Sequence, residues 1–252
     1  MADALFLAHT LARLVAASRS VAVGTNSPIP AAATLLAREQ AAQHNGRMVI
    51  SILGSPRHTP FTDGGRELFD FAAQGRLDSF FLGGGQIDGN GNINLLGIGD
   101  PTRPKLPGKR SFGSAYLYSL VPNVVLFRDE HSPRVLVSQV DFTSAAGSGP
   151  DGSYRPGGPR WLVTGRAVFR FDPARNRFRL HSIHPGETLD EVTALTGFAV
   201  DLDDGFGETP TPDTKTLALL RGPVARELAF AYPRFAAQHF PSGHFSSEGH
   251  PA

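Results

Sequence analysis

Short apolar segments alternate with helical ones over the first third of the chain, and this order constrains the fold more than any other feature. Apolar, β-branched runs occupy residues 20–24, 47–53 and 79–82. Segments with helical spacing separate them, over residues 31–43 and 65–77. Strands that alternate with helices form a largely parallel sheet with helices on its faces. We therefore predict an α/β fold with a mixed, mostly parallel sheet covered by helices.

The second half of the chain predicts a C-terminal β-hairpin followed by a short helix. Two alternating apolar runs, over residues 160–171 and 177–183, flank a turn-forming segment. Thr188 and Glu191 then form a capping box, in which each side chain accepts a hydrogen bond from the other residue's backbone N–H. This motif predicts a helix over residues 189–196.

Turn-forming residues set the remaining boundaries. Residues 93–99 can pair back as a strand, and Gly222–Pro223 is expected to interrupt a helix at residues 217–220. The sequence has no clear linker between two domains. We therefore expect one domain over residues 1–240 and a polar, poorly ordered tail over residues 241–252.

The composition excludes several classes of function. Twenty-four basic residues against 23 acidic ones leave no strong field, so we expect neither nucleic acid nor a membrane as a partner. The chain has no cysteine, which rules out thiolate chemistry and cysteine-bound metal centres. No apolar run approaches the ~20 residues that span a bilayer, and the N-terminal segment lacks the basic start of a signal peptide. We expect a soluble, cytoplasmic protein.

A glycine-rich turn follows the apolar segment that ends at Leu82. Gly83, Gly84 and Gly85 remove every Cβ from the chain there, which permits positive φ angles and exposes backbone N–H groups. Such a turn can bind a ligand through its amides. On local sequence alone, an ordinary turn is the more common outcome.

Histidine and carboxylate spacing gives little support for a metal centre. His181 and His184 are three residues apart on a predicted strand, where this spacing directs the side chains to opposite faces. Asp201, Asp203 and Asp204 lack the ligand spacing of a calcium loop, and we expect them to be solvated. The sequence motifs of zinc proteases, α/β-hydrolases and nucleotide P-loops are also absent. We predict no metal.

A dense group of ionisable residues ends the predicted strand over residues 123–128. It includes Arg128, Glu130 and His131. Acid–base residues and ligands commonly lie at such strand ends in open α/β sheets. A solvated loop with one ion pair is the alternative.

Three motifs together resemble one family. They are LGGGQIDGNGNINL at residues 82–95, GKRSFGSAYLY at 108–118, and VFRFDPARNRFRLHSIHPGETLDEVTALTGF at 168–198. Their order and spacing resemble the β subunits of class I coenzyme A transferases. Within that family, GGGQIDG, RSFGSA and LFRDEH are most similar to the subunits of acyl-CoA hydrolases that cleave steroid rings.

The resemblance implies how such a chain works. It implies a β subunit that needs a homologous α subunit, in a heterodimer or an α2β2 heterotetramer, with the active site at their junction. It also implies an acyl-CoA substrate, and no cofactor besides the coenzyme A that is part of this substrate.

The chain departs from the family pattern at one catalytic position. Transferases of this family carry a nucleophilic glutamate directly after the strand that matches residues 49–52, where this sequence reads Ile52-Leu53-Gly54. Covalent transfer through an acyl anhydride needs that carboxylate. We therefore predict a hydrolase that opens a ring of a steroid-derived CoA thioester, with the reactive carboxylate on the α subunit. A CoA-transferase and a non-catalytic partner subunit are the alternatives.

The resemblance gives this chain supporting roles. Gln86, Ser111 and Ser114 are predicted to assist catalysis. Other residues are predicted to line the thioester site, with their amides stabilising a developing oxyanion: Gly83, Gly84, Gly85, Asn92, Asn94, Phe112, Gly113 and Ala115. For the two asparagines, a turn-stabilising role is the alternative. Arg128, Glu130 and His131 are weaker candidates, for ion pairs across the subunit boundary or for contact with the acyl group.

Overall fold

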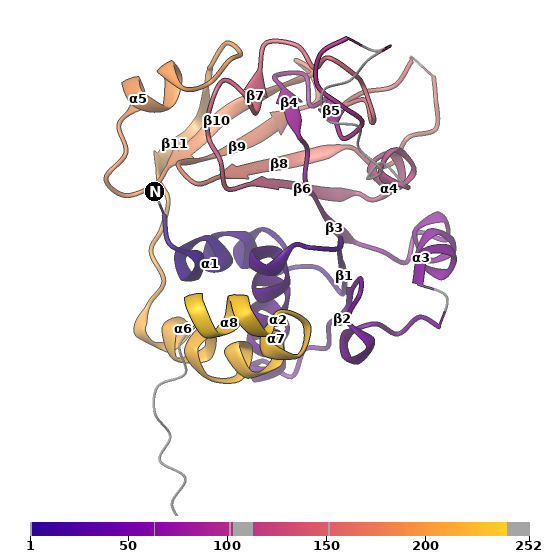
Figure 1. The fold of residues 1–252 in the computed structure, drawn as a ribbon, viewed down its shortest axis with the longest axis vertical. Helices are drawn as coiled ribbons and strands as arrows, with labels where there is room; N and C mark the ends of the chain where they lie inside the picture. The colour runs from indigo at the N-terminus through magenta and orange to yellow at the C-terminus, as the bar shows by residue number, and fades with distance from the viewer. Residues whose placement is uncertain (1, 63, 101, 103–112, 151, 241–252) are drawn as a thin grey trace, which may run out of the picture.

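The computed structural model describes residues 2–62, 64–100, 102, 113–150 and 152–240 (Figure 1). Within them, eight strands form a sheet in the order β11-β10-β9-β8-β6-β3-β1-β2. Neighbouring strands are parallel except at β9, which pairs antiparallel with β8 and β10. The strands are β1 (Ser20–Val23), β2 (Val49–Ile52), β3 (Ser79–Leu82), β6 (Asn123–Arg128), β8 (Pro159–Thr164), β9 (Ala167–Asp172), β10 (Arg177–Ile183) and β11 (Leu202–Glu208).

A small sheet and a set of helices cover the large sheet. The small sheet has the order β5-β4-β7, formed by β4 (Gln86–Asp88), β5 (Ile93–Asn94) and β7 (Leu136–Val137). The helices are α1 (Ala4–Leu14), α2 (Pro28–Gln43), the 3₁₀ turn η1 (Pro56–His58), α3 (Gly64–Ala73), α4 (Ser114–Leu120), α5 (Leu189–Ala194), α6 (Thr214–Leu219), the π turn η2 (Leu220–Val224), α7 (Ala225–Ala231) and α8 (Pro233–His239).

Two hydrophobic cores lie on the two faces of the large sheet. One core packs Val23, Phe81 and Val125 against α1, α2 and the C-terminal helices, which Figure 1 shows gathered together. The other packs Phe80 and Leu126 against α3, α4 and the small sheet. Successive strand residues point to opposite faces, which is why adjacent residues enter different cores. The predicted mostly parallel sheet covered by helices is confirmed.

Residues 160–171 form two strands, β8 and β9, where the sequence predicted one run. The chain turns at Gly165, whose N–H donates to the Asp129 carbonyl oxygen at 2.8 Å. A Cβ on Gly165 would lie 2.5 Å from that oxygen, so the close approach requires glycine. The predicted hairpin of residues 160–171 with 177–183 is therefore the pair β9–β10, and β8 adds a second hairpin to it.

The predicted strand over residues 93–99 is reduced to Ile93–Asn94. The Asn94 Oδ1 atom accepts hydrogen bonds from the N–H groups of Leu96 (3.0 Å) and Gly97 (3.3 Å). This side chain therefore satisfies the backbone groups that a longer strand would pair, and the chain turns away.

Gly222–Pro223 does not end the C-terminal helix. The chain passes through the π turn η2 and continues as α7. A proline ring clashes with the carbonyl four residues earlier in a regular α-helix, and a wider turn relieves that clash.

Two further predictions concern the helix after Thr188 and the C-terminal tail. The helix after Thr188 is confirmed with both halves of its capping box. The predicted tail over residues 241–252 lies outside the described residues. Among the described helices, none combines the length and the apolar character needed to cross a membrane.

Candidate functional site

The strand order creates a topological switch point between β1 and β3. After β1 the chain crosses through α2 to β2 on one side, and it then crosses through α3 to β3 on the other side of β1. The two helices pack on opposite faces of the sheet. In open α/β sheets, ligands bind in the crevice that forms at the carboxyl ends of the strands at such a point. The glycine-rich turn after β3 begins at this edge.

Close packing accounts for two of the three glycines in that turn. A Cβ on Gly84 would lie 2.9 Å from the carbonyl oxygen of Gln86. A Cβ on Gly85 would lie 3.2 Å from the carbonyl oxygen of Asn94, which also accepts a hydrogen bond from the Gly85 N–H at 2.7 Å. Gly83 is partly exposed, and a Cβ there would meet its nearest atom at 3.4 Å. The turn is thus fixed to the small sheet, and Gly83 has the most open surroundings of the three.

The side chains of Gln86 and Asn94 are buried and bonded within the chain. The Gln86 Oε1 atom accepts from Asn94 Nδ2 (2.7 Å) and from the Asp141 N–H (3.0 Å), and its Nε2 donates to the Asp141 carboxylate (3.1 Å). Asn94 Nδ2 also donates to the Gly97 carbonyl oxygen (2.6 Å). These bonds tie β4 and β5 to the loop after β7. No sequence pattern pointed to Asp141, which completes this network.

Asn92 also bonds within its own turn. Its Nδ2 donates to the Asp88 carboxylate (3.0 Å), and its Oδ1 accepts from the Gly147 N–H (3.0 Å). The other oxygen of Asp88 accepts from the N–H groups of Asn90 and Asn92, both at 3.0 Å. This geometry favours the turn-stabilising alternative for the two asparagines over contact with a substrate.

The predicted site residue Gly113 packs against α3. Gly113 precedes α4 with a φ of +70°, and a Cβ there would lie 2.1 Å from the Phe69 ring, so only glycine fits. Ser114 is buried as the first residue of α4, and Ala115 is exposed. The predicted site residues Ser111 and Phe112 lie outside the described residues.

Of the ionisable residues after β6, some lie at the surface and one lies in the interior. Glu130 accepts from Nε (3.1 Å) and Nη2 (2.6 Å) of Arg134 and from the Ser132 hydroxyl (2.7 Å), and these bonds, led by Arg134, lower the pKa of Glu130. Arg128 is partly exposed and lies 3.8 Å from Glu130. His131 is buried, so of these three predicted residues only Arg128 and Glu130 are at the surface.

His131 and His184 form a buried cluster with three threonines. His131 Nδ1 lies 2.8 Å from Thr164 Oγ1, and its Nε2 lies 3.0 Å from Thr196 Oγ1. His184 Nδ1 lies 2.9 Å from Thr209 Oγ1, and its Nε2 lies 2.9 Å from the Thr164 carbonyl oxygen. Burial lowers the pKa of each histidine to about 4. Both rings are therefore neutral at physiological pH. We call this group the histidine–threonine cluster.

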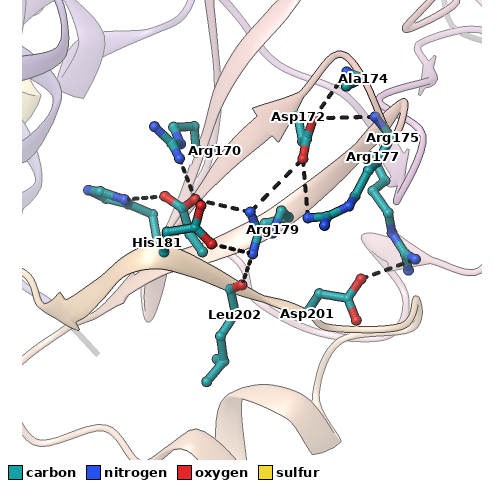
Figure 2. Close-up of polar contacts among 11 residues, drawn as sticks. Arg170, Asp172, Ala174, Arg175, Arg177, Arg179, His181, Asp201 and Leu202 are labelled. Atoms are coloured by element: carbon teal, nitrogen blue, oxygen red, sulfur yellow. Dashed lines mark hydrogen bonds and ion pairs between the residues drawn. The ribbon is translucent and has the colours of Figure 1, made fainter.

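A charge ladder crosses β9, β10 and β11 (Figure 2). It consists of Arg170, Asp172, Arg179, His181, Asp203 and Asp204, which ion pairs connect. The Asp203 carboxylate bonds to Arg170 and to His181 Nδ1 (2.8 Å), and Arg179 lies 3.7 Å from it. The expectation that Asp203 is solvated is wrong, because its side chain is only 1% exposed and is paired with these basic side chains. Within the described part of the chain, no cluster of three or more histidine, aspartate or glutamate side chains could hold a metal ion.

A hollow of about 660 Å³ lies over the charge ladder. Asn123, Arg160 and Trp161 line part of it. These residues begin β6 and β8, so the hollow lies at the amino ends of the parallel strands. The glycine-rich turn lies at the opposite edge of the sheet, and the two features are therefore separate.

The turn after β2 lies at the same edge as the glycine-rich turn, beside the end of β1. The Leu53 N–H donates to the Val23 carbonyl oxygen at 3.1 Å and so extends the pairing of β1 with β2. Gly54 follows with a φ of +88°, and a Cβ there would meet no atom within 4 Å. The turn thus presents an apolar side chain and a glycine at the edge of the sheet where the switch point lies.

A polar cluster joins this turn to the C-terminal helices. Ser55 Oγ lies 2.9 Å from His58 Nδ1, and His58 Nε2 lies 2.7 Å from Glu227 Oε2. Arg57 donates to both carboxylate oxygens of Glu227, at 3.1 and 2.9 Å. Arg57, followed by His58, lowers the pKa of Glu227 to about 2. Sequence patterns did not indicate this cluster, since 169 positions separate His58 from Glu227.

Comparison with protein families decides the family of the chain. The model of the coenzyme A transferase family matches residues 7–195. The chain belongs to the coenzyme A transferase family. Its glycine-rich turn, the turn after β2 and the bend before α4 all lie within the matched segment.

Curated relatives of this coenzyme A transferase family member include subunits of two kinds of enzyme. It is 35% identical over 172 residues to one subunit of the 3-oxoadipate CoA-transferase of Pseudomonas knackmussii, with 65% of each sequence covered. It is 31% identical over 163 residues to the IpdB subunit of the cholesterol ring-cleaving hydrolase of Rhodococcus jostii, with 62% of each covered. The chain thus spans less than two thirds of the length of either relative.

Solved structures share the fold of this coenzyme A transferase family member. Glutaconate coenzyme A-transferase from Acidaminococcus fermentans superposes with a TM-score of 0.77 at 24% identity, covering 92% of this chain and 97% of that one. Rhodococcus jostii IpdAB superposes with a TM-score of 0.73 at 25% identity, covering 88% and 94%. The predicted CoA-transferase-like fold is confirmed.

Proposed function

We propose that this chain is the β subunit of a heteromeric acyl-CoA hydrolase that opens a carbon ring of a steroid-derived CoA thioester. A homologous α subunit would complete a heterodimer or an α2β2 heterotetramer and would supply the reactive carboxylate. Both curated relatives are named as single subunits of larger enzymes, which supports a heteromeric arrangement. Coenzyme A enters this reaction as part of the substrate, and the proposal needs no other cofactor.

One observation carries the choice of hydrolysis over transfer. The turn after β2 presents Leu53 and Gly54, and neither residue can form an acyl anhydride. Glu227 approaches this turn through His58, yet its oxygens are bonded to Arg57 and His58 and its pKa is about 2. A carboxylate of such low basicity, with both oxygens engaged, is a weak nucleophile. Glu227 therefore does not replace the family's glutamate.

The proposed reaction needs groups that stabilise negative charge. Opening a ring beside a carbonyl group places charge on an enolate or oxyanion, and preorganised N–H donors stabilise it. We assign this role to the backbone of Gly83 at the switch point, where the chain is partly exposed. One such donor lowers the barrier by on the order of 3 kcal/mol. The buried Gln86 and Asn94 side chains would hold the turn that presents it.

The decisive test is the origin of the oxygen in the product. The chain is produced together with its α partner and supplied with a ring-containing, steroid-derived acyl-CoA in ¹⁸O-labelled water. We expect a ring-opened product that carries the label. Its formation should require both chains. Exchange of coenzyme A onto an acceptor acid, without ring opening, would show that hydrolysis is the wrong reaction.

A CoA-transferase is the second candidate, and the 35% identity to the 3-oxoadipate CoA-transferase subunit favours it. Transfer of this kind passes through a covalent thioester between an enzyme carboxylate and coenzyme A. Treatment with acyl-CoA followed by hydroxylamine would detect such an adduct on this chain. The hydrolase proposal predicts no adduct on it.

A third candidate, a subunit that only completes the fold of its partner, is tested by substitution at the turn. Gly83→Ala adds a methyl group at a partly exposed position whose nearest atom is 3.4 Å away. Gly207→Ala on β11, where a Cβ would meet no atom within 4 Å, is the matched control. Selective loss of turnover in the Gly83 variant supports a lining role. Equal activity and assembly of both variants would support the non-catalytic candidate.

A further inference from the structure

Ser55, His58 and Glu227 form a chain of hydrogen bonds that we call the His58 relay. An ionised carboxylate only accepts hydrogen bonds, so His58 Nε2 donates to Glu227 Oε2 across 2.7 Å. In a neutral imidazole the other nitrogen is an acceptor, and Nδ1 then receives the Ser55 hydroxyl proton across 2.9 Å. The tautomer of His58 and the direction of the Ser55 O–H bond are therefore set by Glu227.

The relay is enclosed, and its charged neighbours keep the carboxylate ionised. Ser55 is 2% and His58 is 3% exposed. Around His58, η1 contributes Arg57 and α7 contributes Glu227. Helix α2 contributes Arg38, 4.0 Å from the Glu227 carboxylate, together with Glu39, which pairs with Arg38 at 3.4 Å. Arg57 and Arg38 lie beside the Glu227 carboxylate, on the Nε2 side of the imidazole. On the Nδ1 side, toward the turn, the ring bonds to Ser55.

The relay holds the turn that stands at the position of the family's catalytic glutamate. The Ser55 N–H donates to the Ile52 carbonyl oxygen at 3.0 Å, which closes the turn around Gly54. Gly54 has open space where its Cβ would be. Glu227 comes from α7, which lies outside the segment of residues 7–195 that the family model matches. A segment beyond the matched region thus reaches back to this edge of the sheet.

We propose that the His58 relay is a positioning device for the hydrolysis proposed above, and in this it rests on that function. It fixes the turn of residues 53–55 at the ligand crevice and sets which way the Ser55 hydroxyl proton points. His58 Nδ1 accepts the hydrogen bond of the Ser55 hydroxyl. The lone pairs of the Ser55 oxygen then point away from the ring. The relay therefore holds Ser55, and with it the turn at the crevice, in one fixed arrangement.

The test measures kcat and KM of the complex with its α partner. Glu227→Gln keeps the size of the side chain and removes its charge, and Ser55→Ala removes the hydroxyl. We expect each variant to lower kcat by at least roughly tenfold and to change KM by less than about threefold. Asp213→Asn is the matched control, since Asp213 caps α6 through the Thr216 N–H at 2.7 Å.

Several results would overturn the relay. Unchanged kcat and KM in folded Glu227→Gln and Ser55→Ala variants would reduce the cluster to a structural tie. Equal losses in the Asp213 control would point to a general effect of the C-terminal helices.

The relay and the proposed hydrolysis can fail separately. If the complex transfers coenzyme A without hydrolysis, the hydrolase proposal fails, and the same kcat measurements on transfer decide whether the relay acts. If the complex turns over no acyl-CoA, ¹⁵N NMR of the imidazole in the full chain decides. A neutral ring protonated on Nε2, with an Nδ1 signal that shifts in Ser55→Ala, supports the relay. A neutral ring protonated on Nδ1 overturns it.

Discussion

His181 and His184 are three residues apart at the end of β10, and the fold surrounds them with opposite kinds of partner. His181 belongs to the charge ladder, where its Nδ1 meets the Asp203 carboxylate at 2.8 Å. His184 belongs to the histidine–threonine cluster, where a hydroxyl and a backbone carbonyl occupy its two nitrogens. The side chain of His181 is 35% exposed, whereas His184 is 2% exposed.

The difference shows that the partner and the burial decide how a histidine contributes to stability. Hydroxyl and carbonyl groups satisfy the neutral ring of His184 and leave burial to oppose its protonation, while His181 shares the charged Asp203 carboxylate with Arg170. The charge ladder should therefore respond to the loss of charged partners. The histidine–threonine cluster should respond to pH.

The largest expected effect is a loss of stability in mild acid. The pKa of His131 and His184 is about 4 in the folded chain and 6.5 in an unfolded one, so the unfolded chain binds more protons between these values. Stability is therefore complete above about pH 6.5 and falls as the pH drops toward 4. Between pH 7 and pH 5 each histidine should cost about 2 kcal/mol of unfolding free energy.

Urea denaturation at the two pH values measures this loss. A His184→Gln variant should lose about half of the pH dependence, because one of the two titrating rings is gone. Equal unfolding free energies at pH 7 and pH 5 in the wild-type chain would contradict the assignment of neutral, buried rings.

The next largest effect is expected from Asp203→Asn in the charge ladder. The substitution removes the buried charge that pairs with Arg170 and His181, and we expect a loss of about 2 kcal/mol. Asp201→Asn is a matched control, because Asp201 is 50% exposed and pairs with Arg177 at 3.1 Å. Chemical denaturation at pH 7 compares the two. A loss of equal size in both variants would argue against a special role for the buried carboxylate.

A smaller effect is expected from Thr209→Val in the histidine–threonine cluster. The Thr209 hydroxyl bonds to Ser182 Oγ (2.7 Å) and to His184 Nδ1 (2.9 Å), and valine has nearly the same shape without it. We expect a loss of about 1.5 kcal/mol that does not depend on salt concentration. Thr193→Val, at an exposed position on α5, is the control. A loss that disappears in high salt would mean that the cluster carries charge at neutral pH.

The smallest effect is expected at the exposed end of the ladder. Asp204 pairs with Arg179 at 2.9 Å, but its side chain is 85% exposed. Asp204→Asn should change the unfolding free energy by less than about 0.5 kcal/mol, and the change should vanish as salt is added. Thermal denaturation in low and high salt measures it. A large, salt-independent loss would show that exposure does not weaken this pair.

The sequence predicted those features whose contacts are local. The capping box of Thr188 and Glu191 is confirmed, because both of its hydrogen bonds span three residues. The strand that precedes the glycine-rich turn is confirmed as β3 for the same kind of reason, since an apolar run bounded by glycines carries its own signal. The parallel sheet follows from the alternation of strands and helices.

Features that depend on distant partners were missed. Strand β11 is rich in aspartate and glycine, and its buried Asp203 is tolerable only because Arg170 comes from another strand. The roles expected for Gln86 and Asn94 came from the family resemblance, and the hydrogen-bond network that holds their side chains depends on Asp141, 55 positions away from Gln86. The link between His58 and Glu227 has no local signal at all. Tertiary packing, which the sequence pattern does not display, decides each of these cases.

The π turn η2 fixes which residue of the last long helical segment can reach His58. Each residue advances an α-helix by about 100°, so one residue inserted by a wider turn rotates everything after it by that angle. Glu227 lies three positions beyond η2 and points at His58 with this rotation in place. Deleting one residue from 220–224 would rotate α7 by about 100° and turn the Glu227 carboxylate away from the imidazole. Inserting or deleting a single residue there can thus change the helical phase of the C-terminal segment.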